Sequence, residues 1–201
     1  MFIIGITGPT GAGKSLFSHY LRARGITVID ADEVYHSLLI PPSDCLDALR
    51  RAFGNNVFSA NGTLDRPALS KIVFGDPQKL TLLNQTVLGF VLERIRQQIR
   101  HLEQDGKTVV AVDAPTLIES GFHLECNRVI SVLADPEIRT ERILLRDKIT
   151  REAAQARIRA QKSDDFYQAH SHFILTNNTS VDAFFAQCDA LSASEKLPIT
   201  Y

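Results

Sequence analysis

Two kinds of hydrophobic pattern alternate along the chain. Short runs of apolar, often β-branched residues predict strands that are buried on both faces, and the stretches between them repeat apolar residues at helical spacing. The predicted strands are residues 2–7, 26–29, 108–112 and 129–133, with a weaker one at 173–175. Strands separated by helices indicate an α/β fold with a five-stranded parallel sheet.

The pattern changes over residues 32–88, where no strong strand signal occurs. Turn-forming residues divide this stretch into short helices at Pro41-Pro42, residues 54–56 and Asn61-Gly62. Asp65 precedes Arg66-Pro67 and Asp76 precedes Pro77, which predicts two helix N-caps with proline in the first turn. The second of these helices should run over residues 77–103. We interpret the whole region as a helical insertion beside the sheet.

One loop carries a phosphate-binding signature. Gly8–Ser15 read GPTGAGKS, which fits G-x-x-x-x-G-K-[ST], between the first strand and a helix predicted over residues 14–24. Such glycines let backbone N–H groups turn toward a phosphate, and the helix directs its positive end at the same anion. Lys14 would reach the β and γ phosphates, and the Ser15 hydroxyl would ligate Mg²⁺. The alternative is a chance glycine turn. The strand before the motif and the helix after it argue against that alternative, so we predict a nucleotide site.

The remaining signals favour a small-molecule kinase over a GTPase. The sequence has no NKxD string, which is typical of guanine sites, and no DxxG string after a second strand. A kinase needs an acceptor pocket, a carboxylate near the acceptor hydroxyl, and cations around the transferred phosphoryl group.

Carboxylates follow two of the predicted strands. Asp30 and Asp32 follow the second strand, at the sheet edge where ligands bind in parallel α/β folds. One of the two would accept a proton from a substrate hydroxyl or orient it, and the alternative is that Asp32 merely caps the next helix. Asp113 ends the third strand and is a candidate Mg²⁺-side carboxylate, or else an ordinary polar turn residue. Glu119, in the loop beyond it, is a candidate acceptor contact.

A basic segment lies late in the chain. Residues 139–162 contain eight Lys and Arg against three Asp and Glu, although the whole chain has a net charge of −1. Asp135-Pro136 and Thr150 predict the starts of two helices, and Arg139, Arg142 and Arg146 would share one face of the first. We interpret this hairpin as a lid that brings guanidinium groups over phosphates, the alternative being a solvated basic face.

Composition limits the other possibilities. The chain has 201 residues, 44% hydrophobic and 22% charged, which excludes a disordered chain or a coiled coil. Its charge balance favours neither nucleic acid nor a membrane as partner. Three widely spaced cysteines indicate neither a zinc site nor a disulfide framework. The N-terminal apolar run is too short for a signal peptide, so we expect a cytoplasmic protein that is a monomer or a weak homo-oligomer.

Several strings occur together in one order. They are IGITGPTGAGKS at 4–15, VIDAD at 28–32, NGTLDR at 61–66, VDAPTLIESG at 112–121, NRVISV at 127–132, RTERILLRD at 139–147 and RIRAQ at 157–161. Shorter matches are Phe53-Gly54, Leu69, Val73-Phe74, Leu83-Asn84 and Asn177. Over nearly the whole chain, this set resembles the dephospho-CoA kinase family.

The resemblance implies an architecture and a reaction. It implies a single three-layer P-loop kinase domain with a core at 1–31, 105–138 and 163–201, a helical coenzyme-binding region at 32–104 and a lid at 139–162. It also implies that ATP phosphorylates the ribose 3′-hydroxyl of dephospho-CoA, the last step of coenzyme A synthesis, to give coenzyme A and ADP. The expected cofactors are ATP and Mg²⁺.

The resemblance also assigns residues to roles. Asp32 matches the family's general base, and Arg142 and Arg146 match its lid arginines. The ATP loop corresponds to Gly11, Ala12, Gly13, Lys14, Ser15 and Leu16, preceded by Gly8. We expect Arg66 and Glu119, together with Asp32, to contact the acceptor, and Asp113 to join Ser15 at the metal.

Four positions depart from the family pattern. Leu16 stands where Thr is frequent, His36 where Arg is common, Leu88-Gly89 where His-Pro is usual, and Tyr167 where many members have Arg. The phosphoryl-transfer residues are therefore intact, whereas expected acceptor contacts are altered. Two alternatives remain open: a kinase for another nucleoside or nucleotide, and a nucleotide-binding regulatory protein with little turnover.

Overall fold

A computed structural model describes residues 1–73, 75–194 and 197–198. Phe74 of the family motif and residues 195–196 and 199–201 of the expected core lie outside the described residues. The chain forms two compact units. The core unit is Met1–Ile29 with Leu102–Tyr201, and the helical unit is Asp30–His101.

The core unit is built on a five-stranded sheet. Its strands are β1 (Phe2–Thr7), β2 (Thr27–Asp30), β3 (Val109–Asp113), β4 (Arg128–Leu133) and β5 (Phe173–Thr176), in the order β2-β3-β1-β4-β5. β1 pairs in parallel with β3 and β4, and β4 pairs in parallel with β5. Every strand begins and ends within one residue of its predicted bounds, and the predicted α/β class is confirmed.

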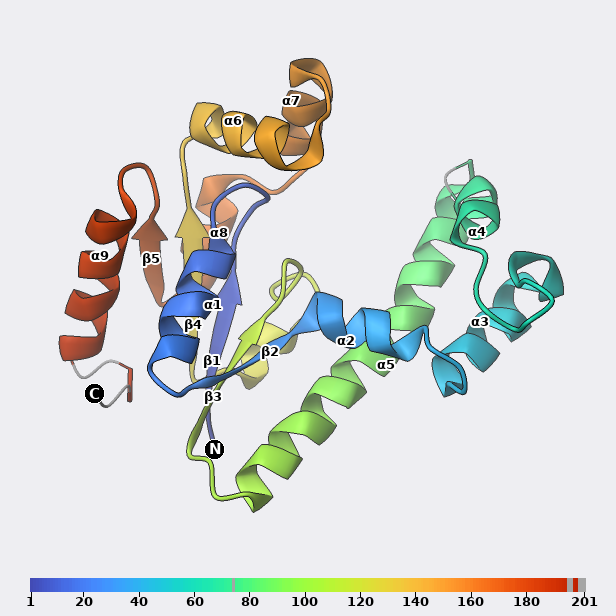
Figure 1. Cartoon of the computed structure of the whole chain (residues 1–201), viewed down its shortest axis with the longest axis horizontal. Helices are drawn as coiled ribbons and strands as arrows, with labels where there is room; N and C mark the ends of the chain where they lie inside the picture. Colours follow the sequence, from blue (N-terminus) through green and yellow to red (C-terminus); the bar gives the residue numbers. More distant parts are fainter. Residues whose placement is uncertain (74, 195–196, 199–201) are drawn as a thin grey trace. The chain divides into compact units, whose positions relative to one another are not determined.

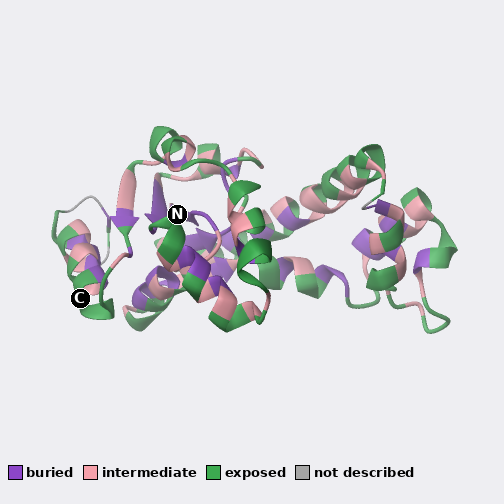
Figure 2. Cartoon of the chain, turned by 90° about the horizontal axis from the view of Figure 1, so that it is seen from above, coloured by how far each residue is buried: buried purple, intermediate pink, exposed green. Residues whose placement is uncertain are grey.

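Apolar side chains of the sheet alternate between two faces. Ile130 and Val132 join the cluster formed with α1 (Lys14–Ala23) and α9 (Val181–Ala193), whereas Leu133 packs on the opposite side with Tyr167 of α8 (Asp164–His170). Figure 1 shows α1 and α9 beside the strands, and Figure 2 shows buried positions gathering along the sheet. Because helices cover both faces, ligands can reach the sheet only at its ends.

The predicted hairpin after β4 is present. It consists of α6 (Pro136–Asp147), with proline in its first turn, and α7 (Arg151–Arg159), capped by the Thr150 hydroxyl, which accepts from the N–H of Ala153. Arg151 of α7 forms ion pairs with Glu137 and Glu141 of α6. Figure 1 shows both helices at the end of the sheet toward which the arrowheads of β1 and β4 point.

The helical unit contains the predicted insertion. Its elements are α2 (Ala31–Leu38), α3 (Asp44–Phe53), the 3₁₀ helix η1 (Asn55–Val57), α4 (Arg66–Val73) and most of α5 (Pro77–Gln104). Another 3₁₀ helix, η2 (Phe122–Glu125), belongs to the core unit. Both predicted N-caps are confirmed: Asp65 accepts from the N–H of Ala68, and Asp76 from that of Gln78. In the described ranges, every helix is too short or too polar to span a bilayer.

Candidate active site

The phosphate loop joins β1 to α1 in a conformation that requires glycine. Gly11 and Gly13 have φ values of 76° and 97°, where residues with a side chain are strained. A Cβ at Gly11 would lie 2.8 Å from the carbonyl oxygen of Arg139, and one at Gly13 would lie 2.2 Å from Nδ2 of Asn177. The predicted glycine pattern therefore reflects both backbone conformation and close packing against α6 and the end of β5.

The first turn of α1 faces this loop. Gly13 is the N-cap and no side chain caps the helix, so the positive end of the helix is directed at the loop. The Lys14 ammonium donates to the carbonyl oxygen of Gly8 at 3.0 Å, which places a cation on the same loop. Ser15 is exposed, as a hydroxyl that ligates a metal must be. These residues come together as the motif predicts.

A buried carboxylate lies beside α1. Asp113 ends β3, is 7% exposed and accepts a 2.6 Å hydrogen bond from the hydroxyl of Ser18. Ser18 follows Ser15 by three positions, so the two hydroxyls share one face of α1. The sequence analysis did not single out Ser18. The available signal was a lone polar residue on the otherwise apolar buried face of this helix.

The donors at this place suit Mg²⁺. Hydroxyl and carboxylate oxygens are hard ligands, and Mg²⁺ in kinases takes most of its other ligands from phosphates and water. Within the described ranges, no three His, Cys, Asp or Glu side chains are grouped to hold a metal by themselves. Ser15 and Asp113 therefore fit a metal that arrives with the nucleotide.

Arg142 of α6 lies against the loop backbone. Its guanidinium donates to the carbonyl oxygens of Gly11 and Ala12, each at 3.3 Å, and to Oδ1 of Asn177 at 3.2 Å. Asn177, only 4% exposed, donates to the Ala12 carbonyl oxygen at 2.9 Å. Burial lowers the pKa of Arg142, although an arginine remains charged at neutral pH. Asn177 thus fixes a cation beside the loop, a role that sequence reasoning had not assigned to it.

Arg139 and Arg146, on the same helix, differ in environment. Arg139 is buried and donates to the carbonyl oxygen of Thr10 at 2.9 Å, so its guanidinium serves the loop backbone. Arg146 is largely exposed and forms an ion pair with Asp147 at 2.7 Å. Asp147 also forms an ion pair with Arg157 of α7. These arginines lower the pKa of Asp147 to about 2, and Asp147 in turn raises the pKa of Arg146. Arg146 is the more accessible of these two guanidinium groups.

Asp32 does not cap α2. The cap is Asp30, whose carboxylate accepts from the N–H groups of Asp32 at 2.8 Å and Glu33 at 3.2 Å. The alternative interpretation of Asp32 as the N-cap is therefore wrong, because the helix begins at Ala31, two residues earlier than that role requires. Asp32 lies exposed in the first turn of α2, two residues after the end of β2.

Two other predicted acceptor contacts lie in different units. In the helical unit, Arg66 at the start of α4 bonds Nδ1 of His36 at 3.1 Å, and His36 is one turn beyond Asp32 on α2. Because arginine can only donate, His36 accepts through Nδ1 in this contact. In the core unit, Glu119 is exposed. The pKa of Tyr167 is raised to about 12, mainly by burial of the tyrosine and secondly by the negative charge of Glu119.

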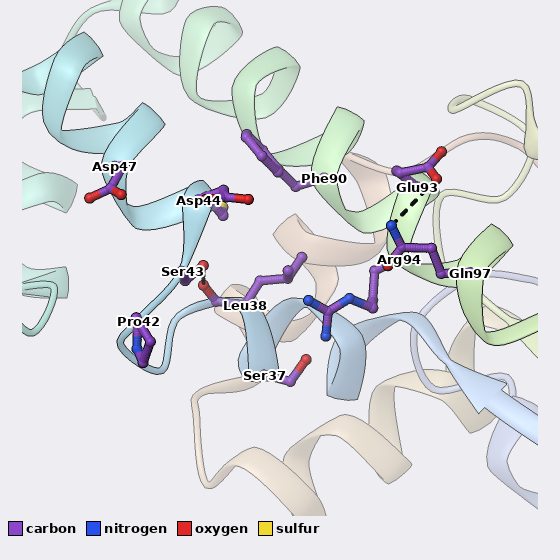
Figure 3. A pocket seen from close by; sticks show the side chains of 11 residues that line it. Ser37, Leu38, Pro42, Ser43, Asp44, Asp47, Phe90, Glu93, Arg94 and Gln97 are labelled. Carbon is purple, nitrogen blue, oxygen red and sulfur yellow. Dashed lines mark hydrogen bonds between the residues drawn. The ribbon is translucent and has the colours of Figure 1, made fainter. Parts of the chain in front are cut away.

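The helical unit also contains a cavity of about 550 Å³ between α2, α3 and α5. Figure 3 shows Leu38, Asp44, Phe90 and Arg94 around it. Ser37 and Leu38 contribute the α2 side, and at about 100° per residue they face away from Asp32. This cavity is therefore distinct from the predicted position of the acceptor hydroxyl.

Comparison with known proteins places this chain in a family. The family model for dephospho-CoA kinase matches residues 2–183. The chain belongs to the dephospho-CoA kinase family. Among its relatives, a dephospho-CoA kinase from Symbiobacterium thermophilum is 37% identical over 190 residues, which cover 94% of this chain and 80% of that protein.

Solved structures similar to this chain include dephospho-CoA kinase from Campylobacter jejuni, with a TM-score of 0.71 and 26% identity over 96% of both chains. The crystal structure of TT1252 from Thermus thermophilus gives a TM-score of 0.80 and 30% identity, covering 96% of this chain and 97% of that one. Membership of the dephospho-CoA kinase family confirms the resemblance drawn from the motifs.

Proposed function

We propose that this chain transfers the γ-phosphoryl group of ATP to the ribose 3′-hydroxyl of dephospho-CoA, producing coenzyme A and ADP. The observation that carries the proposal is a phosphate loop with two cations beside it in a member of this family. Lys14 bonds the Gly8 carbonyl oxygen, Arg142 bonds those of Gly11 and Ala12, and α1 begins on this loop without a side-chain cap. Phosphoryl transfer depends mainly on such positioning and charge stabilisation, since the protein forms no covalent bond itself.

The nucleotide is bound by the core unit. Backbone N–H groups of the loop and the first turn of α1 would bind the β and γ phosphates, with Lys14 leaving the Gly8 carbonyl to join them. Arg142, fixed by Asn177, supplies a second cation at the loop. Arg146 would exchange Asp147 for a phosphate when the lid closes, because its exposed ion pair is easily broken.

Mg²⁺ would be held by Ser15 and Asp113. Bound there, it would neutralise charge on the β and γ phosphates. Ser18 would orient the Asp113 carboxylate through the 2.6 Å hydrogen bond that their side chains form.

The acceptor is bound by other residues. Asp32 would orient the 3′-hydroxyl and accept its proton, as the exposed carboxylate of α2 that does not cap the helix. Arg66 and Glu119 would contact the remainder of dephospho-CoA. His36, bonded to Arg66, would keep that guanidinium in place where many family members have a second arginine.

The direct test is to measure ADP release from ATP and Mg²⁺ with and without dephospho-CoA, and to identify the product by mass. We expect ADP to form only with the acceptor and in equal amount to coenzyme A. ATP binding without acceptor-dependent turnover would refute the proposal. A panel of nucleosides and nucleotides in place of dephospho-CoA would then show whether another acceptor is used.

A further inference from the structure

Both ends of the lid hairpin contact one residue of the phosphate loop. Arg139 lies near the start of α6, and Gln161 lies two residues beyond the end of α7. Thr10, between them, is more than 120 residues away in sequence from either side chain. The contact therefore joins the two points at which the chain enters and leaves the lid to the loop that binds phosphate.

Three hydrogen bonds close a ring among these residues. Nε of Arg139 donates to the carbonyl oxygen of Thr10 at 2.9 Å. Oε1 of Gln161 accepts from the N–H of Thr10 at 3.0 Å and from Nη2 of Arg139 at 2.9 Å. The ring uses both backbone polar groups of Thr10, so the peptide planes on either side of this residue are fixed.

The charged residue of the ring, Arg139, is buried. Arg139 is 4% exposed, and burial lowers the pKa of its guanidinium. A buried cation needs hydrogen-bond acceptors, and removing one leaves a costly unsatisfied donor. Loss of the Gln161 oxygen would thus disturb two donors at once, the Thr10 N–H and Arg139, rather than one.

We propose that Gln161 is a positioning residue that anchors the base of the lid to the phosphate loop. Its oxygen accepts from Thr10 and Arg139, and through these two residues it acts on the loop that binds ATP. The ring holds the base of the hairpin against the loop, whereas α6 and α7 are joined farther out by exposed ion pairs such as Arg157 with Asp147. Lid movement then leaves the shape of the phosphate loop unchanged. The proposal rests on the kinase reaction proposed above.

Three variants test it. Gln161→Leu keeps the approximate shape and removes the acceptor, Gln161→Glu keeps an acceptor against Arg139, and Gln168→Leu is a matched control at an exposed glutamine of α8. We expect Gln161→Leu to reduce kcat/KM for ATP about tenfold or more and to leave the KM for dephospho-CoA within about twofold. Gln161→Glu and Gln168→Leu should stay within about threefold of the parent.

A second readout reports on the ring directly. In the parent protein, the Thr10 amide should be protected from hydrogen exchange, because Gln161 accepts its proton. Protection should be lost in Gln161→Leu and kept in Gln161→Glu. This measurement needs no turnover and no acceptor, so it separates failure of the ring from failure of the proposed kinase reaction.

Three results would overturn the inference. One is an unprotected Thr10 amide in the parent protein. This result can be obtained even if Gln161→Leu does not fold. Another is a Gln161→Leu variant with a lower melting temperature but unchanged kcat/KM for ATP, which would reduce the ring to a structural element. The third is an equal loss in Gln161→Glu and Gln161→Leu, since the role depends on the acceptor oxygen.

Discussion

Individual side chains at this site depend on a neighbour that determines what they can do. Asp30 accepts the two N–H groups at the start of α2, and Asp32, two residues later, is exposed. Ser18 donates to Asp113, which gives the buried carboxylate one orientation beside α1. In the first pair, Asp30 stabilises the helix and Asp32 is the residue assigned to chemistry. In the second pair, Ser18 orients the carboxylate and Asp113 is the residue assigned to the metal.

The adjacent aspartates give a matched pair of variants. Asp32→Ala should lower turnover of dephospho-CoA about a hundredfold or more, because a general base is lost, with no change in the free energy of unfolding. Asp30→Ala should lower the free energy of unfolding by about 1 kcal/mol through loss of the N-cap. Steady-state kinetics and denaturant unfolding measure both effects. Normal turnover by Asp32→Ala would remove this residue from the mechanism.

Ser18→Ala tests how Asp113 is oriented. Removing the hydroxyl leaves the carboxylate without this donor, so the Mg²⁺ concentration for half-maximal activity should rise several-fold, to about tenfold. The control is Ser192→Ala, a buried serine of α9 whose hydroxyl bonds the Cys188 carbonyl oxygen. Both variants should lose about 1 kcal/mol of stability. If Ser18→Ala and Ser192→Ala showed the same Mg²⁺ dependence, Asp113 would not be a ligand of the metal.

Among the elements, the lid helices combine a fixed base with an outer part joined by exposed charges. Arg139 and Arg142 of α6 bond loop carbonyls and are partly or fully buried, whereas Arg146 pairs with Asp147 near the end of the helix. Exposed ion pairs contribute little and exchange readily. The helix can therefore keep its first turns on the loop while its last turn changes partners.

The pH dependence of the outer lid follows from Asp147. Its folded-state pKa is lowered from 3.8 to about 2, mainly by the Arg146 hydrogen bond, so its contribution to stability is present above pH 3.8 and lost as the pH falls toward 2. At neutral pH, Asp147→Asn should imitate that loss and make α6–α7 more sensitive to trypsin. Asp165→Asn, at an exposed acid of α8, is the control. Unchanged cleavage would show that this pairing does not hold the hairpin.

Across the whole molecule, the residues assigned to ATP lie in one unit, and those assigned to the acceptor lie in the other except for Glu119. The phosphate loop, Asp113 and the lid arginines are in the core unit, and Asp32 and Arg66 are in the helical unit. The nucleotide residues contact one another within their own unit, so they form a site whose geometry is already defined there. ATP binding should consequently be separable from acceptor binding.

Arg66→Ala tests this separation. The KM for dephospho-CoA should rise about tenfold through loss of a charged contact, while the Kd for ATP measured by calorimetry stays the same. Arg51→Ala, at an exposed arginine of α3, controls for the loss of a positive charge in the helical unit. A parallel rise in the Kd for ATP would contradict the assignment of Arg66 to the acceptor.

Local features of this protein are readable from its sequence because their causes are local. Strand and helix bounds follow from periodicity and caps such as Asp65 and Asp76, and the phosphate loop follows from glycine spacing next to Lys14 and Ser15. Motif content was also sufficient to indicate the family. These signals act over a few residues, where backbone conformation and hydrogen bonding depend on nearest neighbours.

The tertiary structure alone decided which distant residues meet. Ser18 and Asp113 are 95 positions apart, and Asn177 and Ala12 are 165 apart. Such contacts depend on strand order, since β3 and β4 flank β1 and β5 lies beyond β4, and hydrophobic periodicity does not encode that order. The ring around Thr10 likewise forms only because the end of β1 and both ends of the lid come together. The string RIRAQ, which ends in Gln161, does not reveal that contact.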